Sequence, residues 1–198
     1  KMVETAIEEH RLSLRFQPIV SLRGETQEMY EVFLRMVDAE GNQVPTGDLF
    51  DAADKANLIV KLDKWVLKEA VRVLADQQKQ GHKTHFFIKL SDQAVKDADV
   101  LLTLKKLLKA SQVPGERIII ELSESTAITQ IKLAQAFIKQ LQANECKSAL
   151  EHFGTGLNSA TTLKHLPVHY VKIDSSFSKG LSSNVENQQA VQNIIKLA

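Results

Sequence analysis

Several residue types and patterns are scarce in this chain, and each scarcity excludes a class of protein. The sequence holds one cysteine, Cys146, so it forms no internal disulfide, which is typical of proteins in a reducing compartment. No run approaches the roughly 18 to 20 apolar residues that span a bilayer, and no charged-then-apolar leader opens the chain. Basic and acidic residues number 25 and 24, so no excess of charge predicts binding to DNA or RNA. We therefore expect a cytoplasmic protein without membrane insertion, with Cys146 in its core.

Apolar and β-branched runs predict six strands. They cover residues 12–20, 30–37, 85–91, 117–123, 147–153 and 168–174. A short polar stretch around Gly24 separates the first two, so we expect an antiparallel hairpin. Amphipathic helices alternate with the later strands. Their apolar faces carry Leu62, Trp65, Val66, Ala70, Val73 and Leu74, then Leu104, Leu107 and Leu108, then Ile131, Leu133, Phe137 and Leu141.

Alternating strands and helices without a break in composition predict one α/β domain over residues 1–198. An open doubly wound sheet would usually carry a glycine-rich phosphate turn after its first strand, and this chain has none. A (β/α)8 barrel typically has eight strands in about 250 residues, against six here in 198. We predict a (β/α)8 TIM-like barrel with an antiparallel first strand, incomplete at its C-terminus. Uncapped helical patterns at both ends predict a segment excised from a larger multidomain regulator.

Charged and polar side chains gather where the predicted strands end. They are Lys89 and Ser91, Glu121 and Ser123, Glu151 and His152, and Lys172 and Asp174, with Glu31 inside the second strand. In a (β/α)8 barrel these strand ends meet at the rim that carries active sites. Lysine repels metal ions, so this mixed rim favours a bound anion over a metal pair. His82 and His85 precede a strand, and we expect both at the surface.

Seven segments, in order and spacing, resemble the EAL family of cyclic di-GMP phosphodiesterases. They are QPIV (17–20), YEVFLR (30–35), NLIVKLDKWVL (57–67), IKLS (88–91), IELSES (120–125), LEHFGTGLNS (150–159) and VKIDSSF (171–177). The resemblance implies a TIM-like barrel and cyclic di-GMP as ligand. It implies that Arg35 clamps a phosphate and that Asp63 accepts hydrogen bonds from a guanine edge. The ligand-binding residues that it implies are Gln17, Glu31, Leu34, Arg35, Asp63 and Lys172.

The same resemblance implies a dismantled metal site. Lys89 stands where active members keep an asparagine ligand, and Glu151 and His152 stand where they keep two aspartates. Matching residues remain as catalytic remnants, namely Glu31, Glu121, Glu124 and Lys172. Because active members use two divalent ions to activate water, we expect no metal, no required cofactor and no enzyme activity, but a cyclic di-GMP receptor. Two alternatives stay open: a weak phosphodiesterase dependent on Mg²⁺ or Mn²⁺, and an interaction scaffold that no longer binds nucleotide.

Among degenerate members, the chain most resembles FimX-type receptors, which govern type IV pili and twitching motility. The segments FQPIVSLRG, LKHLPVHYVKIDSSF and VENQ carry this likeness. It implies an upstream degenerate diguanylate-cyclase domain and a PilZ-type adaptor as protein partner. We expect bound cyclic di-GMP to order the loop at residues 154–159 and so change the surface that the adaptor meets.

Overall fold

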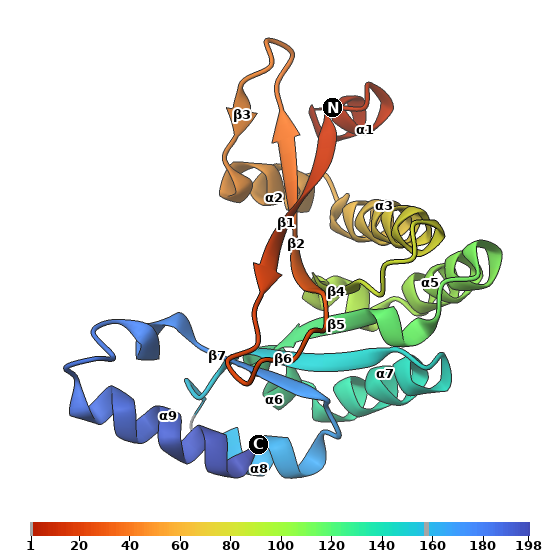
Figure 1. Ribbon diagram of the computed structural model, residues 1–198. Coiled ribbons are helices and arrows are strands. Elements are labelled where there is room, and N and C mark those ends of the chain that lie inside the picture. The colour runs from red at the N-terminus through yellow and green to blue at the C-terminus, as the bar shows by residue number, and fades with distance from the viewer. Residues whose placement is uncertain (1, 157–158) are drawn as a thin grey trace. The chain divides into compact units, whose positions relative to one another are not determined.

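The computed structural model describes residues 2–156 and 159–198, and the chain divides into two compact units, 1–118 and 119–198 (Figure 1). Residues 157 and 158, which belong to the loop expected to respond to ligand, lie outside the described part. In that part, no helix is long and apolar enough to cross a membrane.

The first unit is built on the predicted hairpin. Strands β1 (Leu12–Ile19) and β2 (Met29–Val37) pair antiparallel, with Gln17 opposite Glu31. Strand β4 (His85–Lys89) pairs parallel with β2, and there Glu31 lies beside Phe87. A two-residue strand, β3 (Gln43–Val44), pairs with the far end of β2 and was not predicted. The hairpin prediction is therefore confirmed.

Helices of the first unit cover this sheet. They are α1 (Met2–Glu8), α2 (Thr46–Lys55), α3 (Ile59–Lys79), α4 (Asp92–Lys96) and α5 (Ala98–Ser111), with the 3-10 turn η1 (Gly115–Arg117). The apolar stripe of α3 buries Leu62, Val66 and Leu74 as predicted, but Trp65 is only half-buried. Helix α2 was not predicted, although Pro45 at its start and an acidic first turn are typical helix signals.

The second unit holds three parallel strands in sequence order: β5 (Ile118–Ser123), β6 (Lys147–Phe153) and β7 (Tyr170–Ile173). Its helices are α6 (Glu124–Thr129), α7 (Ile131–Ala143), α8 (Ser159–His165) and α9 (Val185–Leu197), with the 3-10 turn η2 (Ser175–Ser178). Five residues of β5 are buried, as expected for a strand covered on both faces.

Two side chains correct the sequence-based predictions, and one confirms them. Leu133, assigned to the buried face of α7, is 44% exposed. His85 is buried rather than at the surface, because it is the first residue of β4 and its ring nitrogen hydrogen-bonds Gln27 at 3.1 Å. Cys146 lies in the core as predicted, and burial raises the pKa of its thiol to about 12. The prediction of an α/β fold is confirmed.

Candidate functional site

Alternation along β2 creates the polar face of the first unit. Val32, Leu34 and Met36 point into the core, whereas Glu31 and Arg35 lie on the half-exposed opposite face. In an antiparallel pair, residues directly opposite share a face, so Gln17 of β1 stands beside Glu31. Three residues predicted as ligand contacts, Gln17, Glu31 and Arg35, thus share one face of the hairpin.

Arg35 is held by its own strand and by the start of α2. One terminal nitrogen, Nη1, donates to the carbonyl of Leu34 at 2.9 Å and to Oγ1 of Thr46 at 3.3 Å. The guanidinium also lies 5.5 Å from the centre of the Phe33 ring, within range of a cation–π contact. Nε and Nη2 make no hydrogen bond with the described residues. The side chain is therefore positioned, with two donors left to meet a planar anion.

Asp63 is a buried acid on α3, 5% exposed. Its Oδ2 accepts a hydrogen bond from the Ser91 hydroxyl at 2.5 Å, and its Oδ1 accepts one from the Ser91 backbone at 3.3 Å. Burial raises the pKa of Asp63 to about 6, although the two bonds from Ser91 oppose that shift. Ser91 also caps α4 by accepting from the backbone of Ala94, so it couples the acid to a helix start.

A cavity of about 420 Å³ in the first unit brings these groups together. The residues that line it come from β2, α2, α3 and the end of β4: Glu31, Val32, Phe33, Leu34, Arg35, Thr46, Phe50, Leu62, Asp63, Val66, Lys89 and Ser91. Four of the predicted ligand contacts therefore border one cavity. Phe50, 37% exposed, is a lining residue that sequence reasoning missed. The sequence feature that could have identified Phe50 is its position among the polar residues of the amphipathic segment 46–55.

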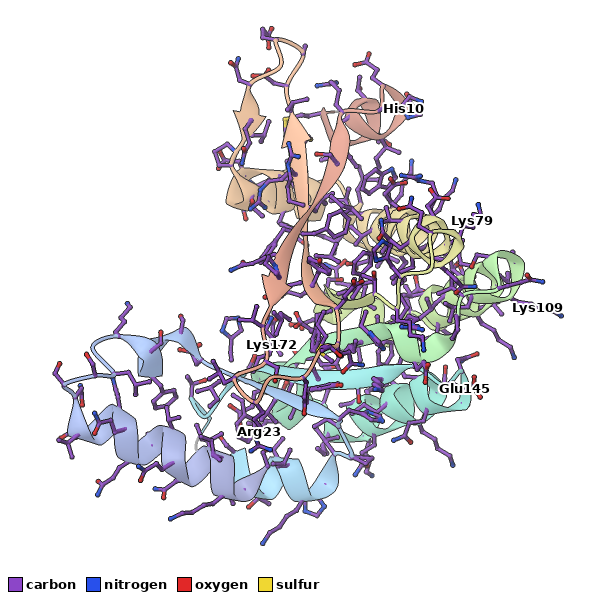
Figure 2. All side chains as sticks on the ribbon, in the orientation of Figure 1. His10, Arg23, Lys79, Lys109, Glu145 and Lys172 are labelled. Atoms are coloured by element: carbon purple, nitrogen blue, oxygen red, sulfur yellow. The ribbon has the colours of Figure 1, made fainter. Side chains whose placement is uncertain are left out.

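In the second unit, Lys172 neutralises a carboxylate. Glu121 of β5 is fully buried, and its Oε1 lies 2.7 Å from the ammonium nitrogen of Lys172 on β7. Figure 2 labels the Lys172 side chain. This pair keeps a charge inside the unit that would otherwise be costly to bury. Lys172 was predicted as a ligand contact, and here its ammonium group is held by Glu121.

Glu124, predicted as a catalytic remnant, holds a loop of the second unit. It is 1% exposed, and its Oε2 accepts hydrogen bonds from the backbone of Gly154 at 3.0 Å and of Gly156 at 3.2 Å. A side chain at Gly156 would meet Ile128 at 2.9 Å and Glu124 at 3.2 Å. A larger residue at this position would therefore require the side chains of Ile128 and Glu124 to shift.

A bulge in β6 aims His152 away from its strand. Strand β6 takes three residue steps from Leu150 to Phe153, whereas the paired strand β7 takes only two over the same stretch. Within this bulge, His152 has a left-handed φ of 55°. Its Nδ1 lies 2.8 Å from Oδ2 of Asp174, and its Nε2 lies 3.7 Å from Glu151. Hydrogen bonds from Ser176, and then from His152, lower the pKa of Asp174 to about 2. Sequence reasoning gave Asp174 no role, although it had marked the residue at a strand end.

A pair of divalent ions, which the family resemblance implies for active members, does not fit these side chains. Lys89 brings an ammonium group to the cavity of the first unit. In the second unit, His152 engages the carboxylate of Asp174. Among residues 2–156 and 159–198, no cluster of three or more histidine, cysteine or acidic residues is arranged to hold a metal ion.

The whole chain, residues 1–198, matches the family model described as EAL domain. The chain belongs to the EAL domain family. It is 30% identical over 196 residues to the cyclic di-GMP phosphodiesterase PdeF of Escherichia coli K12, and 28% identical over 193 residues to PdeA of Borreliella burgdorferi. These matches cover 99% and 98% of this chain but only 26% and 29% of the relatives. The chain thus spans between a quarter and a third of each relative's length.

A solved structure gives a further comparison. The EAL domain of FimX from Pseudomonas aeruginosa, bound to c-di-GMP, matches with a TM-score of 0.90 and 36% identity. The match covers 98% of this chain and 78% of that one. It confirms the predicted TIM-barrel-like α/β fold class.

The relatives correct one expectation drawn from the sequence, namely that this chain is not an enzyme. PdeF and PdeA, which it resembles over nearly its whole length, are both named phosphodiesterases. The expectation was wrong because it relied on the substituted positions Lys89 and His152 alone. Glu31, Glu121 and Glu151 still carry carboxylates, and an imidazole is itself a common metal ligand.

Proposed function

We propose that this EAL domain binds cyclic di-GMP in the cavity formed by β2, α2, α3 and the end of β4. The observation that carries the proposal is the grouping of Arg35, Asp63 and Phe50 around one cavity of about 420 Å³. A guanine dinucleotide needs a cation for its phosphates, an acceptor for the N–H groups of a base edge and an apolar surface for the base. Each of the three residues meets one of these needs.

The roles follow from chemistry. Nε and Nη2 of Arg35 form a planar fork that suits two phosphate oxygens. The Asp63 carboxylate accepts from the guanine N1–H and amino group. Phe50 offers a ring face for stacking, a contact worth about 1–3 kcal/mol per base in single-stranded nucleic-acid complexes. The FimX EAL domain, 36% identical, was solved with c-di-GMP bound, which supports the ligand.

Titration of the purified domain with cyclic di-GMP tests this function. We expect saturable binding of the dinucleotide by isothermal titration calorimetry, and binding of GMP at least tenfold weaker, because a mononucleotide fills only part of the cavity. A second titration after treatment with EDTA shows whether a divalent ion contributes. If cyclic di-GMP produces no heat of binding with a domain that shows a cooperative thermal transition, the proposal is wrong.

Hydrolysis of cyclic di-GMP is the second candidate function. The names of PdeF and PdeA favour it, as do the remaining acids Glu31, Glu121 and Glu151. The ammonium group of Lys89, which stands where active members keep an asparagine ligand, argues against a bound metal pair. Incubation with Mn²⁺ or Mg²⁺ and chromatography for linear pGpG separates the candidates. Product that accumulates in proportion to domain concentration and is abolished by EDTA establishes hydrolysis, whereas unchanged dinucleotide leaves binding as the function.

The finer part of the proposal concerns signalling. As the sequence resemblance to FimX-type receptors implies, the proposed role is to regulate type IV pili and twitching motility through a PilZ-type adaptor. In this proposal the chain is one EAL-type domain of a longer regulator that also carries a degenerate diguanylate-cyclase domain. A dinucleotide signals to a partner only if it favours one of two protein states. Capture of the adaptor with and without cyclic di-GMP, on the full-length protein, tests this role.

The raised pKa of Asp63 predicts that pH acts on ligand binding and on stability in opposite directions. Binding uses the carboxylate, so affinity is constant above pH 6 and falls up to about tenfold per unit as pH drops below the pKa of about 6. The free domain behaves in the reverse way. Between the ordinary value of 3.8 and about 6, the folded state binds more protons than the unfolded state, so stability falls as pH rises.

The variant Asp63→Asn isolates both effects. We expect it to bind weakly at every pH and to lose the difference in thermal stability between pH 4 and pH 6 that the parent owes to this acid. Asp174, whose pKa is about 2, titrates below that window and so contributes little. Parallel pH profiles of parent and variant, in both affinity and melting temperature, would contradict this assignment.

A further inference from the structure

We propose, on the basis of the function proposed above, that Ser91 sets the preference of the cavity for a guanine base, because its hydroxyl holds the Asp63 carboxylate where both oxygens meet the base edge. Ser91 is then a positioning residue, which acts through Asp63 rather than through a contact of its own with the ligand. The sequence placed Ser91 at the end of a predicted strand and gave it no role in binding.

Within the described part of the chain, both hydrogen bonds that fix the Asp63 side chain come from Ser91. The hydroxyl donates to Oδ2 at 2.5 Å, a length typical of an O–H group bonded to an ionised carboxylate, and the backbone N–H donates to Oδ1 at 3.3 Å. A carboxylate otherwise turns readily about its last side-chain bond. Because one donor lies at each oxygen and the hydroxyl is the closer, the Ser91 hydroxyl carries most of the restraint on that rotation.

Ser91 is itself held in place by α4. Its Oγ accepts a hydrogen bond from the backbone of the buried residue Ala94 at 3.1 Å, which makes Ser91 the N-cap of the helix. A hydroxyl that accepts one bond and donates another has a defined direction. The start of α4 therefore orients the donor that Asp63 receives.

The chemistry of the base edge explains why this orientation matters. Guanine presents two donors side by side, the N1–H and the exocyclic amino group, and the two oxygens of one carboxylate accept from both at once. Each oxygen has two lone pairs, so the bonds from Ser91 leave an acceptor position on Oδ1 and another on Oδ2 of Asp63. Asp63 is 5% exposed and lines the cavity, so these acceptors are offered to a ligand rather than to bulk water. A base without the amino group leaves one of them without a partner.

Three substitutions of Ser91 test the role by isothermal titration calorimetry at pH 8, above the Asp63 pKa of about 6. Ser91→Gly and Ser91→Ala remove the hydroxyl, and we expect each to raise the Kd for cyclic di-GMP about 3- to 10-fold, the effect of one lost hydrogen bond. Ser91→Thr keeps the hydroxyl and should stay within about twofold of the parent. Glycine is a tolerated N-cap, so Ser91→Gly preserves most of the stability of α4.

Asn184→Ala is the matched control for the loss of a helix cap. Asn184 is the N-cap of α9 and accepts from the backbone of Asn187 at 3.1 Å, as Ser91 accepts at α4. We expect this variant to melt at a lower temperature, as Ser91→Ala does, but to keep the Kd of the parent. Circular dichroism melting of every variant sets a titration temperature at which all of them are folded.

Discrimination between bases is a readout that a merely structural serine would not move. Cyclic di-IMP, the inosine analogue that lacks the amino groups, should bind the parent about tenfold more weakly than cyclic di-GMP, because one buried acceptor then has no partner. In Ser91→Gly this ratio should shrink at least threefold, since a carboxylate that turns freely gains less from the second donor. Ser91→Thr and Asn184→Ala should keep the ratio of the parent.

The pH profile of binding gives a second such readout. Burial raises the pKa of Asp63 to about 6, and the bond from the Ser91 hydroxyl opposes that shift. Without the hydroxyl, the pH below which affinity falls should be higher in Ser91→Gly than in the parent. The other ionisable side chains that line the cavity are Glu31 and Arg35 of β2 and Lys89 of β4, and α2 and α4 add none among the described residues. These three side chains are the same in every variant, so they do not produce the difference.

The outcomes separate this inference from the function on which it rests. A parent that does not bind cyclic di-GMP overturns both. A parent that binds cyclic di-GMP and cyclic di-IMP equally overturns the role of Ser91 alone. So does a Ser91→Gly variant with the base preference and pH profile of the parent, which would leave Ser91 as a helix cap. If Ser91→Gly does not fold, Ser91→Ala takes its place, and an equal loss of affinity in Asn184→Ala would overturn the role because destabilisation would then explain it.

Discussion

Replacing Lys172 with methionine is expected to lower the free energy of unfolding by about 3 kcal/mol, the lower end of the range for breaking a buried ion pair. The reason is Glu121, which is fully buried, with its carboxylate 2.7 Å from the Lys172 ammonium. Without the lysine, the acid must stay charged without that counter-ion or take up a proton. The lower end applies because the lysine side chain is 27% exposed, so water screens part of the interaction. Urea unfolding, followed by circular dichroism, measures the change.

A double-mutant cycle shows whether the loss comes from the pair itself. Glu121→Gln combined with Lys172→Met removes both charges, and we expect it to be more stable than Lys172→Met alone. Lys132→Met, an exposed lysine at the start of α7, controls for loss of a surface charge and should change stability by less than about 0.5 kcal/mol. If Lys172→Met unfolds at the same urea concentration as the parent, other groups around Glu121 compensate its charge.

Much of the fold followed from periodicity in the sequence. The short polar link around Gly24 predicted the hairpin, and the apolar run of β5 predicted a strand buried on both faces. These features are local, because neighbouring residues determine strand periodicity and turn length. The likeness to EAL proteins added a prediction of which residues contact the ligand, and four of these residues border the cavity.

The structural features that the sequence did not predict share a physical cause: they depend on contacts between distant segments. His85 looked like a surface histidine in a polar stretch, yet pairing of β4 with β2 buries it against Gln27. The register shift in β6 gives His152 its left-handed backbone and its contact with Asp174, and no local pattern signals a bulge. The enzyme prediction failed differently, since it treated single substitutions as decisive.

Arg35→Ala is expected to weaken cyclic di-GMP binding by about 1.5 to 3 kcal/mol, the range for hydrogen bonds to charged groups. Nε and Nη2 of Arg35 are the donors assigned to phosphate, and alanine removes both together with the charge. Stability should fall by about 0.5 to 1.5 kcal/mol for each of the two hydrogen bonds, to Leu34 and Thr46, that alanine removes, and the cation–π contact with Phe33 is lost as well. Arg35→Lys should recover part of the affinity, since it restores charge without the planar fork.

Calorimetry on Arg35→Ala, with Arg72→Ala as control, measures the effect. Arg72 is 59% exposed on α3 and pairs only with Glu69 and Asp76 among the described residues, so its loss should not change the Kd. If Arg35→Ala and the parent bind cyclic di-GMP with equal affinity, the ligand does not bind beside Arg35 of β2.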